Sequence, residues 1–316
     1  MNPSIALLAS DSSHLPLLAV FQECGATQKY GFDLELDLVG SARAPKLADR
    51  SRLLLAGEVD FVSGLHHEPY LWRARGDKRL VYLAQTQNNW DDRLLVSGNI
   101  GALESLKGKK IICHCSAPCV RGNLAALLAD HGFKKDEIRI EAIEDMSGSY
   151  RSYVDQVIAG AVDATLVDMP FDLYGRKGGL KILDLPDRPV IHNTTILTTT
   201  DYIKKNREKV TAFLKALIEA IHFFKTRPDD VARILKKNLS RRYGLEDEEY
   251  FVHLQQGWAK LLLAKPYPSP AAIHNVYELD AGKDPEMSRT APLEPWDLHY
   301  LREIDDSGFI DRLYAV

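Results

Sequence analysis

The chain has 316 residues, of which 45% are hydrophobic and 27% are charged, and this length allows two lobes with separate cores. Its 40 basic and 44 acidic residues give a net charge of −4, so there is no positive field to attract nucleic acid or an anionic membrane. No apolar run approaches the roughly 20 residues of a membrane-spanning helix. We therefore expect neither a nucleic-acid partner nor direct insertion into a membrane.

The start of the chain leaves two locations open. The sequence MNPSIALLAS leads straight into a strand-like segment and lacks the basic region and long apolar core of a secretory signal. The protein is expected in the cytoplasm if the chain is complete as given. It is expected in the periplasm, or at the outer side of a membrane, if a leader was omitted. Four cysteines without disulfide-like spacing favour a reducing compartment.

The N-terminal part of the chain predicts strands that alternate with helices. Residues 34–39 show the strand pattern, because leucines alternate with acidic side chains as in a half-buried strand. Gly57 marks the end of a predicted helix. In chain order, the elements are a strand over 5–9, a helix over 15–23, a strand over 34–39, a helix over 45–56 and a strand over 59–63.

A second copy of this unit follows two further predicted strands, over 78–85 and 93–96. The segments LAGEVD at 55–60 and IAGAVD at 158–163 match, since in each a helix ends at a glycine before a strand that begins at Val-Asp. Two such units predict two similar α/β lobes. The second unit consists of a strand from Ile111, a helix from Asn123, a strand over 138–143, a helix over 149–159 and a strand over 162–167.

The C-terminal part is predicted to be mainly helical. Two short strands lead into it, and a proline-rich loop over 266–270 interrupts it. Its predicted elements are strands over 181–183 and 195–199, helices over 206–224, 228–239 and 247–263, a segment over 296–307 and a final short helix. One lobe would then be continuous over 96–197. The other would combine 1–95 with 198–316, and two linker strands would allow the lobes to close over a ligand.

Six short segments carry a resemblance to a known family. In the order expected for that family they are LPL at 15–17, KYGFDLEL at 29–36, AGEVDF at 56–61, SLKGKKI at 105–111, AGAVDA at 159–164 and EKVTAFLKA at 208–216. With them the chain resembles the NMT1/THI5-like group and the nitrate, sulfonate and taurine solute-binding proteins. The resemblance implies the two-lobed α/β fold of type II periplasmic binding proteins, with a ligand cleft between the lobes. It also implies a small-molecule ligand, and an ABC permease as a partner.

The resemblance leaves the activity open, because the family also contains pyrimidine-synthesising enzymes, desulfinases and more distant decarboxylases. The yeast-type pyrimidine synthases carry a cysteine cluster where this chain has His192-Asn193-Thr194-Thr195. Their cofactor-binding lysine would lie near His66, where this chain has no lysine. We therefore expect no pyridoxal phosphate and no other cofactor. The Cys, His and Arg of the desulfinases cannot be assigned to positions in this sequence.

The loop between the strand at Ile111 and the helix at Asn123 is one candidate wall of a ligand site. A helix start offers free N–H groups and partial positive charge, which suit a carboxylate or sulfonate. Arg121 could pair with such a group, and Ser116 and Cys119 share the loop. The same surroundings would favour a Cys119 thiolate, a nucleophile if the protein is an enzyme.

The other cysteines near this loop predict packing rather than metal binding. Cys113 and Cys115 are two residues apart on a predicted strand, so both would face one side and His114 the other. No second pair of metal-ligand spacing accompanies them. We therefore expect buried apolar cysteines and no metal site.

Loops at other predicted strand ends complete the candidate site. His66 or His67 with Glu68 could form an acid–base pair in an enzyme, or contact ligand in a receptor. Small polar side chains and free amides in such loops are common ligand contacts. The remaining candidate ligand contacts are Ser12, Ser13, His14, Tyr70, Ser147, Asp168 and Asn193.

Two functions remain open from the sequence. The first is an ABC-type solute-binding protein for a small organic anion, a carboxylate or sulfonate. The alternative is an enzyme on the same fold, acting on a small aromatic or heterocyclic acid, with Cys119, His66 and Glu68 as its catalytic residues.

Overall fold

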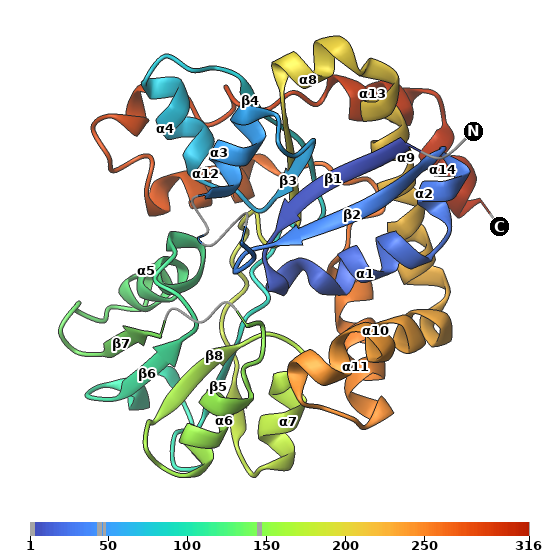
Figure 1. Cartoon of the computed structure of the whole chain (residues 1–316). Coiled ribbons are helices and arrows are strands. Elements are labelled where there is room, and N and C mark those ends of the chain that lie inside the picture. The colour runs from blue at the N-terminus through green and yellow to red at the C-terminus, as the bar shows by residue number, and fades with distance from the viewer. Residues whose placement is uncertain (1–3, 43–45, 47–48, 144–146, 316) are drawn as a thin grey trace.

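The computed structural model describes residues 4–42, 46, 49–143 and 147–315. They form two lobes, each built around a five-stranded mixed sheet with helices on its faces (Figure 1). The start of the helix predicted over 45–56 lies partly outside the described residues. In the part of the chain described, no helix combines the length and the apolar character needed to span a bilayer.

The first sheet has the strand order β2-β1-β3-β10-β4. Strand β1 lies parallel to both β2 and β3, whereas β10 lies antiparallel to β3 and β4. Its strands are β1 (Ser4–Ser10), β2 (Phe32–Leu38), β3 (Phe61–Ser63), β4 (Leu80–Gln85) and β10 (Thr195–Thr199). The register pairs the alternating leucines of β2 with β1, which explains the half-buried pattern of residues 34–38.

The second sheet repeats this arrangement in the order β7-β6-β8-β5-β9. Strand β6 lies parallel to β7 and β8, and β5 lies antiparallel to β8 and β9. Its strands are β5 (Arg93–Val96), β6 (Lys110–Cys113), β7 (Arg139–Ala142), β8 (Ala164–Val167) and β9 (Lys181–Leu183). The predicted repeat of two α/β units is therefore confirmed at the level of sheet topology.

Two segments carry the chain between the sheets, one from β4 to β5 and one from β9 to β10, and we call them the crossover segments (residues 86–92 and 184–194). They pair with each other along their length. The N–H of Trp90 donates to Arg188 O (3.0 Å), that of Val190 to Asn88 O (2.9 Å) and that of Thr86 to Thr194 O (3.2 Å). These bonds give the hinge region the form of a short two-stranded ribbon.

Helices between the parallel strands cover the sheets. In the first lobe they are α1 (Leu15–Glu23), α2 (Ala26–Lys29), α3 (Asp49–Ala56) and α4 (Glu68–Ala74), and in the second α5 (Asn123–Asp130), α6 (Arg151–Ile158) and α7 (Phe171–Lys177). Helix α4 was not predicted, because Glu68-Pro69 reads as a turn in the sequence, whereas proline is well tolerated in the first turn of a helix.

The C-terminal helices extend the first lobe and also contact the second. They are α8 (Thr200–Lys205), α9 (Arg207–Thr226), α10 (Pro228–Tyr243), α11 (Glu248–Leu261), α12 (Pro270–Leu279), α13 (His299–Asp306) and α14 (Phe309–Tyr314). Helix α9 buries apolar residues at helical spacing, and Phe213 among them stacks on Phe61 of β3 (centroids 3.8 Å apart). The others include Val210, Leu214, Leu217, Ile218 and Ile221. Helix α12 was missed. Its buried residues Ala272, Ile273 and Val276 join the apolar core of the second sheet.

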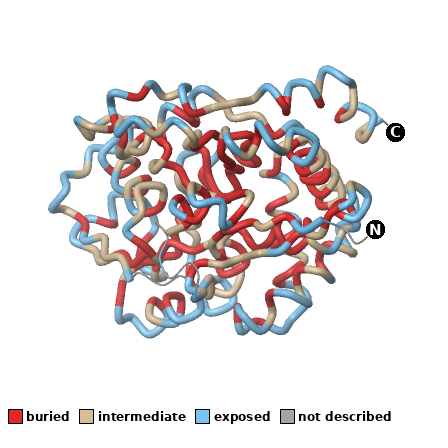
Figure 2. The backbone as a smooth tube through the Cα atoms, turned by 45° about the horizontal axis from the view of Figure 1, so that its top comes forward, coloured by how far each residue is buried: buried red, intermediate tan, exposed pale blue. Residues whose placement is uncertain are grey.

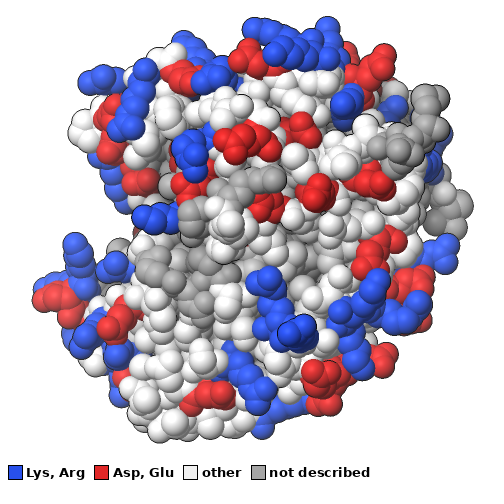
Figure 3. Space-filling model, in the orientation of Figure 1, with Lys and Arg blue, Asp and Glu red and all other residues white. Residues whose placement is uncertain are grey.

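Burial follows these layers, since the strands and the inner face of α9 form the buried centre of the molecule (Figure 2). On the face shown in Figure 3, basic and acidic side chains are interspersed, as the small net charge suggests. No single-sign patch dominates that face.

Candidate functional site

A cavity of about 320 Å³ is lined by residues from both lobes and from both crossover segments. Its walls come from the loops that follow the parallel strands β1, β3, β6 and β8. Because the carboxyl ends of parallel strands meet at one edge of a sheet, the two sheets direct these loops toward a shared space. The lining includes Asp11, Ser13, His14, Arg50, Gly64, His66, His67, Glu68, Asp92, His114, Cys115, Cys119, Asp168, His192, Asn193 and Asp280.

One part of the first-lobe wall is a hydrogen-bond network around Arg50. Its Nη1 lies 2.9 Å from Asp11 Oδ2 and 2.6 Å from Ser63 O, and its Nη2 donates to Gly64 O (3.2 Å). Nδ1 of His14 lies 2.6 Å from Ser63 Oγ. Gly64 has φ of +82°, and its missing side chain leaves room for the His14 ring, with which a Cβ would collide.

Burial decides the charge of the groups in this wall. Burial lowers the pKa of His14 to about 4, against the opposing effect of Asp11, so the imidazole is neutral at pH 7. Burial acts to raise the pKa of Asp11, but His14, Arg50 and the bonds from Ser13 outweigh it and hold that pKa far below its usual range. Asp11 and Arg50 therefore form a buried ion pair at neutral pH.

A relay of hydrogen bonds fixes the tautomer of His66. Nε2 of the Gln85 amide donates to His192 O (2.8 Å), so its Oε1 is free to accept from the hydroxyl of Thr195. With its proton used there, Thr195 Oγ1 must accept from His66 Nε2 (3.0 Å). This relay assigns the proton of His66 to Nε2 and leaves Nδ1 as an acceptor.

Several imidazole nitrogens beside the cavity lack a partner. Among the described residues, none bonds to Nδ1 of His66 or to either ring nitrogen of His67. Burial, together with the neighbouring histidines, lowers the pKa of His66 well below its ordinary value, and burial lowers that of His67 to about 4. Both rings are therefore neutral at pH 7 and can bond to a ligand.

The second-lobe wall includes a π-helical turn, Pro118–Gly122, between β6 and α5. This turn separates Cys119 and Arg121, which the sequence predicts to line the same wall. Positions two apart in a helical turn point to opposite sides, so Cys119 lines the cavity while Arg121 is exposed at a different hollow, beside Leu279 and Lys283. The expectation that Arg121 forms a wall of this cavity is corrected accordingly.

The expected thiolate at Cys119 is also corrected. Burial raises the pKa of its thiol to about 11, although His192 acts in the opposite direction, so the thiol is protonated at neutral pH. Strand β6 ends at Cys113, so the strand alternation predicted for the next residues does not apply. Both His114 and Cys115 line the cavity, and the His114 ring also meets Tyr150 edge to face.

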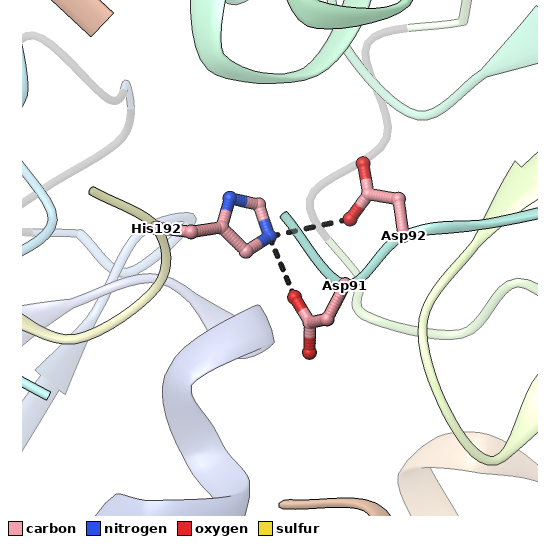
Figure 4. Close-up of side chains that lie close together, drawn as sticks. All are labelled: Asp91, Asp92 and His192. Carbon is pink, nitrogen blue, oxygen red and sulfur yellow. Dashed lines mark ion pairs between the residues drawn. The ribbon is translucent and has the colours of Figure 1, made fainter. Parts of the chain in front are cut away.

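The crossover segments contribute a compact cluster of Asp91, Asp92 and His192 (Figure 4). Nε2 of His192 lies 3.0 Å from Asp91 Oδ1 and 3.3 Å from Asp92 Oδ1, and all three residues are buried. Burial disfavours the charged imidazole, but the two carboxylates outweigh it and raise the pKa of His192 well above its ordinary value. Asp91 and Asp92 were not predicted from the sequence as site residues. The one available signal was an acidic pair placed directly before the buried strand β5.

Asp168 approaches this cluster from the end of β8. Burial, Asp92 and Asp91 raise its pKa well above the ordinary range, so its carboxyl holds a proton at pH 7. Tyr150 Oη donates to Asp168 Oδ2 (2.9 Å). The carboxylic acid of Asp168 is thus positioned beside the carboxylate of Asp92.

The structure brings many of the predicted site residues to the cavity and places others elsewhere. Those at the cavity, for which ligand contact stays a prediction, are Ser13, His14, His66, His67, Glu68, Cys119, Asp168 and Asn193. Those outside its lining are Ser12, Tyr70, Ser116, Arg121 and Ser147.

Each of the residues outside the lining has a structural reason for its position. Tyr70 is buried in the first lobe and its Oη donates to Pro292 O (2.8 Å). Ser12 packs directly against Gly148 of the second lobe, and the hydroxyl of Ser147 accepts from the N–H of Ser149 (3.1 Å). Ser116 is exposed.

Residues 33–231 match the family described as NMT1/THI5 like. The chain belongs to the NMT1/THI5-like family. This confirms the resemblance found in the sequence. No curated protein matches the chain in sequence.

Solved structures with the periplasmic-binding-protein fold are similar over nearly the whole chain. A putative periplasmic sulfonate-binding protein of a sulfonate ABC transporter from Methylobacillus flagellatus has a TM-score of 0.68 at 16% identity, with 98% of this chain and 96% of that chain covered. The periplasmic nitrate-binding protein NrtA from Synechocystis has a TM-score of 0.66 at 15% identity, covering 96% and 89%. A cysteine-to-serine mutant of DszB, solved with biphenyl-2-sulfinic acid, has a TM-score of 0.66 at 13% identity, covering 96% and 99%. At these identities the likeness establishes the fold.

Proposed function

We propose that this protein is a solute-binding protein for a small organic anion, and that the cavity between its lobes is the binding site. The observation that carries the proposal is the composition of that cavity, whose lining comes from both lobes and both crossover segments. A ligand bound there would contact both lobes at once and would stabilise their closed arrangement. Solved proteins of the same fold include sulfonate- and nitrate-binding components of ABC transporters.

The cavity offers suitable contacts for an anionic group. Ser13 and His14 lie at the start of α1, and Cys119 lies in the turn that leads into α5. The first N–H groups of a helix have no partner within it, and the helix dipole adds partial positive charge there. Two carboxylates of the lining have a positively charged partner, since Asp11 pairs with Arg50 and Asp92 with His192.

The tautomer of His66 narrows the ligand further. Its unpaired Nδ1 is an acceptor, so the best ligand brings a hydrogen-bond donor as well as an anionic group. A hydroxy- or amino-substituted carboxylate or sulfonate has both. At about 320 Å³ the cavity is at the small end of ligand sites and suits a compact molecule.

This function requires an ABC permease as a partner. It also requires a periplasmic or exterior location. Both belong to the proposal. The enzymatic alternative with a Cys119 nucleophile is not favoured, because the thiol is protonated at neutral pH and the nearby Arg121 does not face it.

Isothermal titration calorimetry with matched pairs of ligands tests the proposal. Short carboxylates and sulfonates with and without a hydroxyl or amino group are titrated into the full chain. We expect saturation at one ligand per chain, with the donor-bearing member of a pair binding more tightly. Cys119→Phe fills the cavity and should abolish binding, whereas Arg121→Ala lies outside it and should bind as wild type does. Equal loss in both variants, or no saturable binding across the panel, would contradict the proposal.

A further inference from the structure

We propose that Asp91, Asp92 and His192 form a divalent cation site at the junction of the two crossover segments, suited to Mn²⁺ or Zn²⁺ (Figure 4). The site does not depend on the proposed function, since the cation alone is the ligand. Residues 91 and 92 belong to the segment that enters the second lobe, and residue 192 to the segment that leaves it.

The two distances from His192 Nε2 to the aspartate oxygens are those expected between ligands of one ion. One ligand atom from each residue lies within 4.8 Å of the other two, and His192 Nε2 lies 3.0 Å and 3.3 Å from the two aspartate oxygens. An ion about 2.1 Å from each donor leaves neighbouring donors roughly 3.0–3.4 Å apart, for octahedral or tetrahedral angles. The same separations also occur in hydrogen bonds, so the distances alone do not decide.

The orientation of the groups distinguishes the two cases. Although Nε2 of His192 is within reach of both carboxylates, it forms no hydrogen bond with acceptable angles to any described residue. Nitrogen and oxygen atoms that lie close together but are not aligned for hydrogen bonds have the arrangement of ligands around a metal ion. The contrast within the same chain is His253, whose Nε2 is hydrogen-bonded to both oxygens of Asp172 (2.9 and 2.8 Å).

The surroundings of Asp92 provide an independent indication. This residue is 6% exposed and lines the cavity, and neither of its carboxylate oxygens accepts a hydrogen bond of acceptable geometry from a described residue. A carboxylate removed from water needs a cation beside it. Without a metal ion that cation is the protonated imidazole of His192, whose Nε2 lies 3.3 Å from Asp92 Oδ1, and a divalent ion would take the place of its proton. Asp11, at the opposite wall, is the contrasting case, because its carboxylate accepts hydrogen bonds from Arg50 and from the backbone N–H of Ser13.

The donor set indicates the kind of ion. An imidazole nitrogen with two carboxylate oxygens suits Mn²⁺ or Zn²⁺ better than Mg²⁺ or Ca²⁺, which favour oxygen ligands only. Side chains of three residues leave coordination positions open, and Asp92 and His192 both face the cavity. An ion held there would link the crossover segments to each other and add positive charge to the cavity.

Electron paramagnetic resonance of Mn²⁺ added to the chelator-treated full chain tests the site. We expect one saturable Mn²⁺ per chain, nitrogen coupling from an imidazole in pulsed spectra, and stoichiometric displacement by Zn²⁺. Asp92→Asn and His192→Gln should each weaken Mn²⁺ binding by more than about tenfold, since even residues that only support metal ligands typically matter by 10–100-fold. His192→Gln should also remove the nitrogen coupling.

His253→Gln is the matched control, because it removes a histidine that pairs with an aspartate in ordinary hydrogen-bond geometry. It should leave Mn²⁺ binding unchanged. If one variant does not fold, as judged by circular dichroism, Asp91→Asn takes its place. Absence of a saturable site, coupling to oxygen ligands only, or a site that survives the substitutions of Asp92 and His192 would each overturn the proposal.

Discussion

The two walls of the cavity differ in how completely their polar groups are paired. On the first-lobe wall, Arg50 and Asp11 bond to each other and to the surrounding backbone. On the wall formed by the crossover segments, Asp92 and the ring nitrogens of His192 lack hydrogen-bond partners among the described residues, and His66, in the first-lobe loop after β3, has an unpaired Nδ1. Buried polar groups in folded proteins are normally satisfied, so unpaired groups that line one cavity call for a functional explanation.

This difference in hydrogen bonding indicates which wall holds the shape of the cavity and which wall binds the ligand. A saturated network is rigid and gains nothing from a new partner. Buried polar groups without partners have already lost their hydration, so a ligand or ion that pairs with them regains that free energy at binding. We therefore assign a structural role to the Arg50 network and a receptive role to the crossover wall, and the predictions below test this assignment.

The largest expected effect is on the structural wall. Arg50→Ala removes a guanidinium whose side chain is 4% exposed and leaves Asp11 buried and unpaired. We expect the free energy of unfolding to fall by about 3–5 kcal/mol, as for other broken buried pairs. Chemical denaturation measures it. The control is Arg52→Ala on the same helix, whose side chain is 61% exposed and whose pair with Asp49 should matter by less than about 1 kcal/mol. Similar losses in the two variants would contradict the assignment.

The next effect is a loss of stability in acid, to which His67 contributes. Burial lowers its pKa to about 4 in the folded state, from an unfolded value near 6.5. Below pH 6.5 His67 binds a proton in the unfolded chain but stays neutral in the folded chain. This contribution is therefore complete above pH 6.5 and is lost as the pH falls toward 4, by up to about 1.4 kcal/mol per pH unit.

His67→Gln removes this titration, so unfolding free energies measured between pH 7 and pH 4 should fall less steeply than in the wild type. Measurements above pH 7 supply the reference, where the two pH profiles should run parallel. Profiles that stay parallel down to pH 4 would show that His67 is not buried as a neutral ring.

A smaller effect tests the relay that orients His66. Thr195→Val keeps the volume but removes the hydroxyl between His66 Nε2 and Gln85 Oε1. The loss of a buried hydrogen-bond partner should destabilise the protein by about 1–3 kcal/mol. The variant should also lose part of the preference for donor-bearing ligands, because the His66 tautomer is no longer fixed. Calorimetry with the matched ligand pairs reads out this preference, and a preference that stays at its wild-type value would refute the relay.

The smallest expected effect is at Cys119. Cys119→Ser is nearly isosteric, and the thiol is protonated in any case, so ligand affinity should change by less than about 1 kcal/mol. Thiol alkylation gives a second measurement. At pH 7 Cys119 should react no faster than an ordinary buried thiol. Rapid alkylation that a bound ligand prevents would restore the nucleophile hypothesis.

The fold could be predicted from the sequence because its signals are local. The match between residues 55–60 and 158–163 identifies two α/β units, and the sheets indeed share the same order around β1 and β6. Helix α12 escaped prediction because its buried side chains pack on the other lobe, and no local sequence pattern records a contact over that separation in the chain.

The site could be predicted only in part. Loops after the parallel strands were correctly expected to gather, as the positions of His14, His66 and Asp168 show. The opposite orientations of Cys119 and Arg121 depend on a π-helical turn, which residue types did not reveal. Asp91 and His192 are about a hundred positions apart, and their proximity arises from the pairing of the crossover segments, which required the structure.

The most direct test of the proposed function is native mass spectrometry of the purified full chain, followed by return of any released ligand to fresh protein. Solute binding predicts one small organic anion per chain, which rebinds at the same stoichiometry and keeps its mass after prolonged incubation. A released molecule that fresh protein converts to a product of different mass would contradict the account and establish an enzyme.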